Sequence, residues 1–142
     1  MDHDFLMLLA RICLSAVYLY SGVDKLMCWD DGLKFCLEFK MPQPKTVLAA
    51  TAIIHVICGL MVLFGFYART GAVILLLFTI VATYWVHNPL GRTGDDFRRE
   101  MTISLEHLAI IGGLLLLAVV GPGDQCRAAG RLHPGRRARG GR

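Results

Sequence analysis

The sequence predicts an all-α integral membrane protein, a four-helix bundle whose helices run up-down-up-down. Of its 142 residues, 55% are hydrophobic and the mean hydropathy is +0.53, values above the usual range for a soluble domain. Four apolar stretches, each close to the ~20 residues with which a helix crosses ~30 Å of hydrocarbon, account for this excess. They are apolar on most faces, whereas a helix on a soluble protein carries one apolar stripe. The four predicted spans are residues 5–23, 47–66, 71–86 and 102–120.

The first span, residues 5–23, is expected to stay in the chain as a membrane anchor. Asp2 and Asp4 stand where a secretory signal carries basic residues. No cleavage site of small residues follows the apolar run. A cleavable leader is therefore not expected.

The segment after the first span predicts a short helix at the membrane surface. Asp30 and Asp31 favour a helix N-terminus, and a partly apolar run follows them over Gly32–Lys40. The sequence Met41–Pro44, which reads Met-Pro-Gln-Pro, ends this helix because its prolines exclude helical backbone before them. The chain then enters the second span.

The remaining elements differ in how they are connected. A tight turn, Tyr67–Thr70, joins the second span to the third. Asp95 or Asp96 is expected to cap the fourth helix well before its apolar run, and Gly121–Gly123 ends it. The chain thus divides into a membrane domain, residues 1–122, and a tail, residues 123–142, whose Gly, Arg, Pro and Ala composition is that of a disordered segment.

The distribution of basic residues predicts that both termini are cytoplasmic. Arginines gather in the tail, and Arg69 stands in the turn between the second and third spans, whereas basic and acidic residues balance in the other two loops. The positive-inside rule then gives an N-in, C-in orientation. The tail has no aromatic residue and no nucleic-acid motif, so the bilayer is its expected partner and nucleic acid is not.

In this orientation, most ionisable residues within the spans fall in the outer half of the membrane. Such residues are costly there, so each is a candidate for function or for a buried pair. At 1.5 Å per residue, His55 lies about 12 Å into its span, and Glu106 and His107 lie about 6–8 Å into theirs. The predicted polar pocket comprises Asp24, Lys25, His55, His87, Glu106 and His107.

Three interpretations of this pocket stay open at this point. The first is a structural network that fixes helix packing, for example through a hydrogen bond between His55 and Glu106. The second is a site for quinone or another small substrate, where His and Glu bind a carbonyl or move protons. The third is a b-type haem held by His55 and His107, which no second His pair supports. No metal site is predicted, because Glu106 and His107 are adjacent and point to different faces of a helix.

The cysteines give one further prediction. Cys28 and Cys36 both lie in the first outer loop, where they form either a disulfide or two free thiols. Their spacing is not that of a C-x-x-C redox motif.

Four segments in order along the chain form a recognisable pattern. Arg11 is followed by Ser21-Gly22 and Lys25-Leu26, then by the Pro-containing turn at 41–44, by Gly59 to Arg69 with Gly65 between them, and by 108–116 with its Gly pair. This pattern resembles the DoxX family over about residues 11–123. The motif positions are Arg11, Gly22, Lys25, Gly65 and Arg69.

The resemblance implies a small four-helix protein of the bacterial plasma (inner) membrane. Some members are subunits of quinone-linked oxidoreductases and others associate with redox-defence partners, so the resemblance implies a membrane subunit of a redox assembly with other protein subunits as partners. Arg11 and Lys25 would contact the membrane interface or headgroups. Members often carry a Glu where this chain has His55, and Lys-Asn where it has Glu106-His107, which predicts a direct contact between His55 and Glu106. The alternatives are a non-catalytic assembly or anchoring subunit and, less favoured because no inverted repeat is evident, a small-solute carrier.

Overall fold

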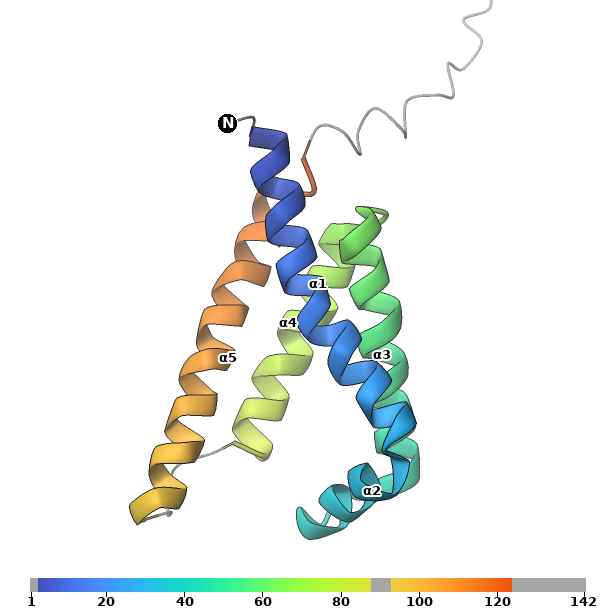
Figure 1. Ribbon diagram of the computed structural model, residues 1–142, viewed down its shortest axis with the longest axis vertical. Coiled ribbons are helices and arrows are strands. Elements are labelled where there is room, and N and C mark those ends of the chain that lie inside the picture. Colours follow the sequence, from blue (N-terminus) through green and yellow to red (C-terminus); the bar gives the residue numbers. More distant parts are fainter. Residues whose placement is uncertain (1–2, 88–92, 124–142) are drawn as a thin grey trace, which may run out of the picture.

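A computed structural model describes residues 3–87 and 93–123 of the chain (Figure 1). Within these ranges the secondary structure is helical and contains no strand. Four of the helices are long and apolar enough to span a membrane, and the remaining helix, Trp29–Glu38, is short. The predicted fold class is therefore confirmed. The helices are α1 (His3–Met27), α2 (Trp29–Glu38), α3 (Pro44–Phe64), α4 (Ala68–Trp85) and α5 (Gly94–Val120).

The long helices begin and end close to where the sequence predicts. α5 starts at Gly94, well before its apolar run. The predicted cap at Asp95 or Asp96 is wrong, because Thr93 is the N-cap residue and both acids lie in the first turn, where negative charge complements the helix dipole. The helix ends at Gly121, whose φ of 93° is a conformation that glycine adopts without strain. The connection from α3 to α4 is a tight turn over Gly65, which is left-handed, and the residues up to Ala68. The tail beyond residue 123 lies outside the described residues.

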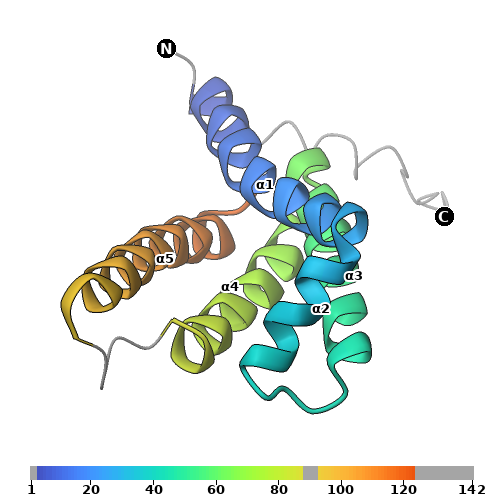
Figure 2. The ribbon, with the colours of Figure 1, turned by 60° about the horizontal axis from the view of Figure 1, so that its bottom comes forward.

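α2 differs in register from the predicted interfacial helix. It spans Trp29–Glu38 rather than Gly32–Lys40, and Asp30 and Asp31 lie in its first turn instead of capping it. Charge in a first turn stabilises a helix through the dipole without a capping hydrogen bond, so both registers satisfy the same sequence signal. α2 folds back beneath the bundle toward α3 (Figure 2), where a Cβ on Gly32 would lie 2.9 Å from Leu48 Cδ1.

Glycines let α1 and α3 pack closely. A Cβ on Gly22 would lie 2.8 Å from Val56 Cγ2 and 3.0 Å from His55 Cβ. A Cβ on Gly59 would lie 3.0 Å from Leu19 Cδ2. Small residues at such contacts allow helix backbones in a membrane to approach and gain van der Waals contact.

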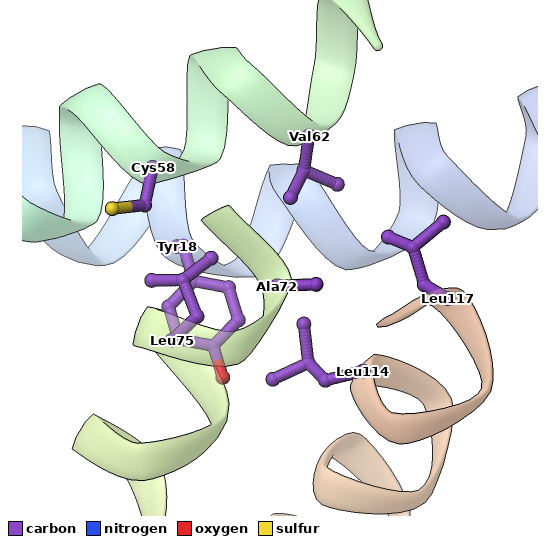
Figure 3. Close-up of a cluster of buried hydrophobic side chains, with 7 residues drawn as sticks. All are labelled: Tyr18, Cys58, Val62, Ala72, Leu75, Leu114 and Leu117. Carbon is purple, nitrogen blue, oxygen red and sulfur yellow. The ribbon is translucent and has the colours of Figure 1, made fainter. Parts of the chain in front are cut away.

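The buried core draws side chains from all four long helices (Figure 3). Small residues such as Ala72 leave room at its centre for larger ones such as Leu75 and Leu114, which are fully buried. α1 and α5 approach near the N-terminal end of α1 and diverge toward the other end (Figures 1 and 2). The bundle is therefore closed at one end and open at the other. The core cluster is Tyr18, Cys58, Val62, Ala72, Leu75, Leu114 and Leu117.

Arg11 closes the end of the bundle where the chain begins. Its side chain is 5% exposed, and its guanidinium donates to Val62 O at 3.0 Å, to Leu63 O at 2.6 Å and to Pro122 O at 3.0 Å. The first two carbonyls belong to the last turn of α3, where carbonyls lack the regular i+4 donor, and Val62 O accepts from Gly65 N at 3.3 Å as well. The prediction that Arg11 contacts lipid headgroups is therefore wrong, because the ends of α3 and α5 take up its donors.

Arg69 binds the C-terminal end of α5 at the same end of the bundle, but its side chain is exposed. Its Nη2 donates to Val120 O at 3.1 Å and to Val119 O at 3.3 Å, in the last turn of α5. A Cβ on Gly121 would lie 2.9 Å from Arg69 Nε, so the absence of a side chain at Gly121 leaves room for the guanidinium. A cation at a helix C-terminus also complements the helix dipole.

Candidate functional site

A pocket of about 620 Å³ lies at the open end of the bundle. All five helices contribute to its wall, which is mostly apolar and aromatic with a few polar groups, the usual composition of a small-molecule site. Five of the six residues of the predicted polar pocket line it. They are Asp24, Lys25, His55, His87 and His107.

Glu106 is the exception, and the acid of this region is Glu100. Glu106 is exposed and does not line the pocket, whereas Glu100 is 7% exposed and its Oε2 lies 3.0 Å from His87 Nδ1. Adjacent residues point to different faces of a helix, so the face that turns His107 inward turns Glu106 outward. Glu100 precedes His107 by two helical turns and shares its face.

The predicted hydrogen bond between His55 and Glu106 is therefore not formed. Neither ring nitrogen of His55 has a hydrogen-bond partner in the described part of the chain, although the side chain is 95% buried with an exposure of 5%. The ring instead packs edge-on against Tyr18 and Phe78, at centroid distances of 5.3 and 4.7 Å. A neutral imidazole has one donor and one acceptor, and leaving each buried and unpaired costs roughly 1–3 kcal/mol.

The hydrogen bonds of His107 fix its tautomer. Thr83 Oγ1 lies 2.7 Å from Thr79 O and 2.7 Å from His107 Nδ1. A hydroxyl has one hydrogen, and a carbonyl can only accept, so Thr83 donates to Thr79 O. His107 Nδ1 must then carry the proton and donate to Thr83, which leaves Nε2 as an acceptor in the neutral ring.

His87 joins His107 to Glu100. The two imidazoles lie 5.2 Å apart between centroids, nearly perpendicular at 77°. His87 Nδ1 donates to the Glu100 carboxylate, and Ser104 Oγ donates to the backbone carbonyl of His87 at 2.7 Å. Two imidazoles and one carboxylate thus form a continuous polar line from the pocket wall toward the start of α5.

Tyr18 ties α1 to α4 behind this line. Its hydroxyl lies 2.6 Å from Thr79 Oγ1, which in turn lies 2.7 Å from Leu75 O. Because Thr79 gives its hydrogen to that carbonyl, Tyr18 is the donor to Thr79. The bond holds the Tyr18 ring against His55 and so shapes the inner wall of the pocket.

Lys25 lies in the pocket wall, in the last turn of α1. Its Nζ donates to Ser21 Oγ at 2.7 Å and reaches Ser21 O at 3.4 Å. The predicted contact with the membrane interface or headgroups stays a prediction, because the side chain is partly exposed and the ammonium group has three donors. Ser21 precedes the Gly22 at which α1 meets α3, so the close packing of these helices also positions the ammonium group.

Cys28 and Cys36 are both free thiols. Cys28 is the N-cap residue of α2 and Cys36 lies within α2, so eight residues of helix at 1.5 Å each separate them by about 12 Å along the axis. This is well beyond the ~4.4–6.8 Å between Cα atoms in a disulfide. The disulfide alternative is thus excluded while α2 is folded. Cys36 is buried in the pocket wall, and burial raises the pKa of its thiol, whereas Cys28 is exposed.

The residues do not fit a haem between His55 and His107. Haem iron needs an imidazole nitrogen with open space for the porphyrin plane. Both nitrogens of His55 are covered by protein atoms, with Tyr18 and Phe78 on the ring.

Sequence reasoning missed four polar contributors to this region. The two threonines of α4 are spaced by four residues and so share a face, and Tyr18 lies seven residues before Lys25 on the same face of α1. That periodicity could have revealed them. The burial of Glu100 had no comparable signal, because its neighbours are polar. The missed residues are Tyr18, Thr79, Thr83 and Glu100.

These features define a small helical membrane protein. Arginines close one end of its bundle, and the open end holds a mostly apolar pocket with a few polar groups. The chain belongs to the DoxX family, whose model matches residues 6–88. It is 27% identical over 118 residues to inner membrane protein YphA of Escherichia coli (83% of this chain, 84% of the relative) and 29% identical over 120 residues to inner membrane protein YqjF (84% and 87%). No solved structure matches the chain significantly.

The family-motif positions divide between the two ends of the molecule. Arg11, Gly65 and Arg69 shape the closed end, and Gly22 sets the contact between α1 and α3. Lys25 alone among the motif positions lines the pocket. The match to residues 6–88 covers α1 to α4, so Glu100 and His107 on α5 lie beyond it.

Proposed function

We propose that this protein is a small subunit of a redox assembly in the bacterial plasma membrane and binds a quinone in the open-end pocket. Both termini face the cytoplasm in this proposal, so the pocket faces the outer side. The names of the relatives, which are inner membrane proteins, support the location in that membrane. The balance of charges in the loops supports the orientation. The electrons are exchanged with a partner subunit.

The observation that carries the proposal is the unpaired imidazole of His55 at the wall of a 620 Å³ pocket. Buried polar groups are paired in the great majority of cases, so an unpaired one needs an explanation. A quinone carbonyl would accept from the imidazole N–H once Phe78 turns aside. The apolar and aromatic side chains around it match the faces of a quinone ring.

Conversion of a quinone to a quinol takes up two electrons and two protons. The residues of this chain can handle the protons. His107 Nε2 is free to accept in the tautomer that Thr83 imposes, and His87 stands beside it with its Nδ1 held by Glu100. Histidine suits this role because its ordinary pKa lies close to neutral pH.

A second candidate function is a non-catalytic assembly or anchoring subunit. The interhelical hydrogen bonds favour it, since Tyr18 with Thr79 joins α1 to α4, and Thr83 with His107 joins α4 to α5. Such bonds commonly hold membrane helices together. In this alternative the polar side chains of the pocket only hold the helices together and bind no ligand.

The substitution His55→Phe separates the two candidates. Phenylalanine keeps a ring between Tyr18 and Phe78 and removes two unpaired polar atoms, so we expect the melting temperature of the protein in detergent to stay the same or rise. Binding of a soluble benzoquinone, measured by calorimetry in lipid nanodiscs, should weaken about tenfold, the equivalent of roughly 1.4 kcal/mol.

Ile57→Phe is the matched control, because Ile57 is 53% exposed on the same helix and lies outside the pocket wall. A clear loss of thermal stability in His55→Phe, with quinone binding unchanged, would favour the structural alternative. Failure of the unaltered protein to bind any quinone would remove the proposal.

A further inference from the structure

The pocket wall includes apolar residues that are also part of the lipid-facing surface. Val17 on α1 and Val81 on α4 line the pocket, yet they are 46% and 57% exposed. Both lie inside spans, where an exposed side chain faces hydrocarbon rather than water. Exposure of this size at a pocket wall fits a pocket that opens between the helices better than a sealed cavity.

The arrangement of helices explains this opening. α1 and α5 touch where a Cβ on Gly113 would lie 3.1 Å from Leu14 Cδ2. Beyond that contact they diverge toward the pocket end (Figures 1 and 2), and Val17 and Ile110 face the pocket from the two separated helices. We call this opening between α1 and α5, which is bounded by Val17 and Ile110, the lateral portal.

The polar groups lie on other sides of the same pocket. The inner wall holds His55 with Tyr18, and the aqueous end holds Asp24, Lys25 and Asp31. A ligand that fits this pattern has a compact polar head with an uncharged carbonyl and an apolar tail that leaves between the helices. The charged aqueous end would oppose passage of the same tail, because burying apolar surface against charge is unfavourable.

The volume leaves room for part of a tail. A quinone ring with its two oxygens has about eight heavy atoms, so it fills less than half of the pocket even at about 30 Å³ each, the share of a water molecule in liquid. The remaining space of the 620 Å³ lies within mostly apolar walls. A tail segment would occupy it without leaving polar groups unpaired.

A phospholipid fits less well than a quinone. A phosphate needs cationic or N–H donors, and Lys25 is the only Lys or Arg among the described residues that line the pocket. Asp24 and Asp31 line it too, and their negative charge would repel a phosphate.

From these observations we infer that the ligand is a membrane-dissolved, tailed quinone that reaches the pocket through the lateral portal and keeps its tail there. This inference rests on the proposed quinone function and adds the route and the tail. It requires no chemistry beyond binding.

The test uses the full chain in lipid nanodiscs and two quinones with the same headgroup, one without a tail and one with a decyl tail. Affinities are referred to the quinone concentration in the bilayer, which removes the effect of simple partitioning. Val17→Trp places a bulky ring in the portal. We expect it to weaken binding of the decyl quinone about tenfold more than binding of the tailless quinone, a difference of roughly 1.4 kcal/mol.

Ile57→Trp is the control, since it adds the same bulk to a lipid-facing position of α3 outside the pocket wall. A decyl quinone with a photoreactive group at the tail end should label the segments around Val17 and Ile110, and excess unlabelled quinone should prevent this.

The outcomes separate the two claims. If Val17→Trp weakens both quinones equally or neither of them, or if the tail labels elsewhere, the portal is wrong while the quinone pocket stands. If a phospholipid carrying the same photoreactive group competes equally for the labelled segments, the inference that a quinone occupies the portal is wrong. If the unaltered protein binds neither quinone, the proposed function itself fails.

Discussion

The two ends of this bundle use buried polar residues in opposite ways. At the closed end, Arg11 directs its donors to three backbone carbonyls and Arg69 directs its Nη2 to two more. At the open end, His55 has two buried nitrogens without a partner among the described residues. One end satisfies the backbone where helices stop, and the other leaves a side chain unsatisfied beside a pocket.

This difference in pairing distinguishes polar residues that stabilise the fold from polar residues that are candidates for function. Buried polar groups in a membrane are costly, so those that are fully paired are accounted for by structure alone. Those that are unpaired beside a cavity are not. A family-motif arginine or an ionisable residue inside a span therefore need not belong to a functional site. Whether its polar atoms already have hydrogen-bond partners indicates which role it has.

The largest expected effect is at the closed end. Arg11→Leu would remove this donor from the carbonyls of Leu63 and Pro122 and would leave Val62 O with only the bond from Gly65 N. Each buried unpaired group costs roughly 1–3 kcal/mol. We expect a loss of about 3 kcal/mol in the free energy of unfolding, measured by thermal and denaturant unfolding in detergent. Arg69→Leu, at the same end but exposed, should cost clearly less. Equal losses in the two variants would contradict the assigned role of Arg11.

A somewhat smaller loss of stability is expected at Gly22, where α1 and α3 pack closely. Gly22→Ala would bring a Cβ within 2.8 Å of Val56 Cγ2 and 3.0 Å of His55 Cβ, so α1 and α3 must separate. Overpacking of this kind costs about 1–3 kcal/mol. The melting temperature should fall and the quinone affinity should fall with it, since the same contact positions His55.

Gly112→Ala is the control for this substitution, because nothing lies within 4 Å of a Cβ built there. It should be neutral or stabilise by up to about 1 kcal/mol, the difference in helix propensity. Destabilisation of both variants to the same extent would show that the close contact at Gly22 is not the cause.

A still smaller effect on stability, but a specific spectroscopic one, is expected at Thr83. Thr83→Val removes one interhelical hydrogen bond, worth about 0.6 kcal/mol on average in a membrane. It also removes the acceptor that holds the proton on His107 Nδ1. Nitrogen NMR of labelled histidine should show His107 as the Nδ1–H tautomer in the unaltered protein and a mixture in the variant. The Nε2–H tautomer in the unaltered protein would overturn the deduced hydrogen-bond direction.

The smallest perturbation is chemical labelling, which should leave stability unchanged. A membrane-impermeant maleimide added to intact cells should modify Cys28, which is exposed, far faster than Cys36. The thiolate is the reacting form, and burial raises the pKa of Cys36, so its labelling should need higher pH than an ordinary thiol. Labelling of Cys28 only after permeabilisation would reverse the proposed orientation.

Much of the fold could be predicted from the sequence because it follows from run lengths and local signals. Four apolar stretches of membrane length require helices, since backbone groups in hydrocarbon must pair within their own segment. The end of α5 at Gly121 and the acidic start at Asp95 and Asp96 are likewise local. The register of α2 was wrong because acidic residues favour a first turn as well as a cap.

The candidate site was predicted only in outline. Rise per residue correctly gathered Lys25, His55, His87 and His107 at one pocket, because depth depends on sequence position alone. The pairing of His55 with Glu106 was wrong, because pairing depends on how each helix is rotated about its axis. Sequence spacing already separates the faces of Glu106 and His107, but it does not say which of them turns inward.

The sequence by itself thus determined that this chain forms four membrane-length helices with polar residues concentrated at certain depths. The tertiary structure decided which polar groups find partners: Arg11 reaches the ends of two helices, Glu100 rather than Glu106 meets a histidine, and His55 is left facing the pocket. The physical reason is that hydrophobicity and helix length act along the chain. Helix rotation and the close approach at Gly22 arise only when the helices pack.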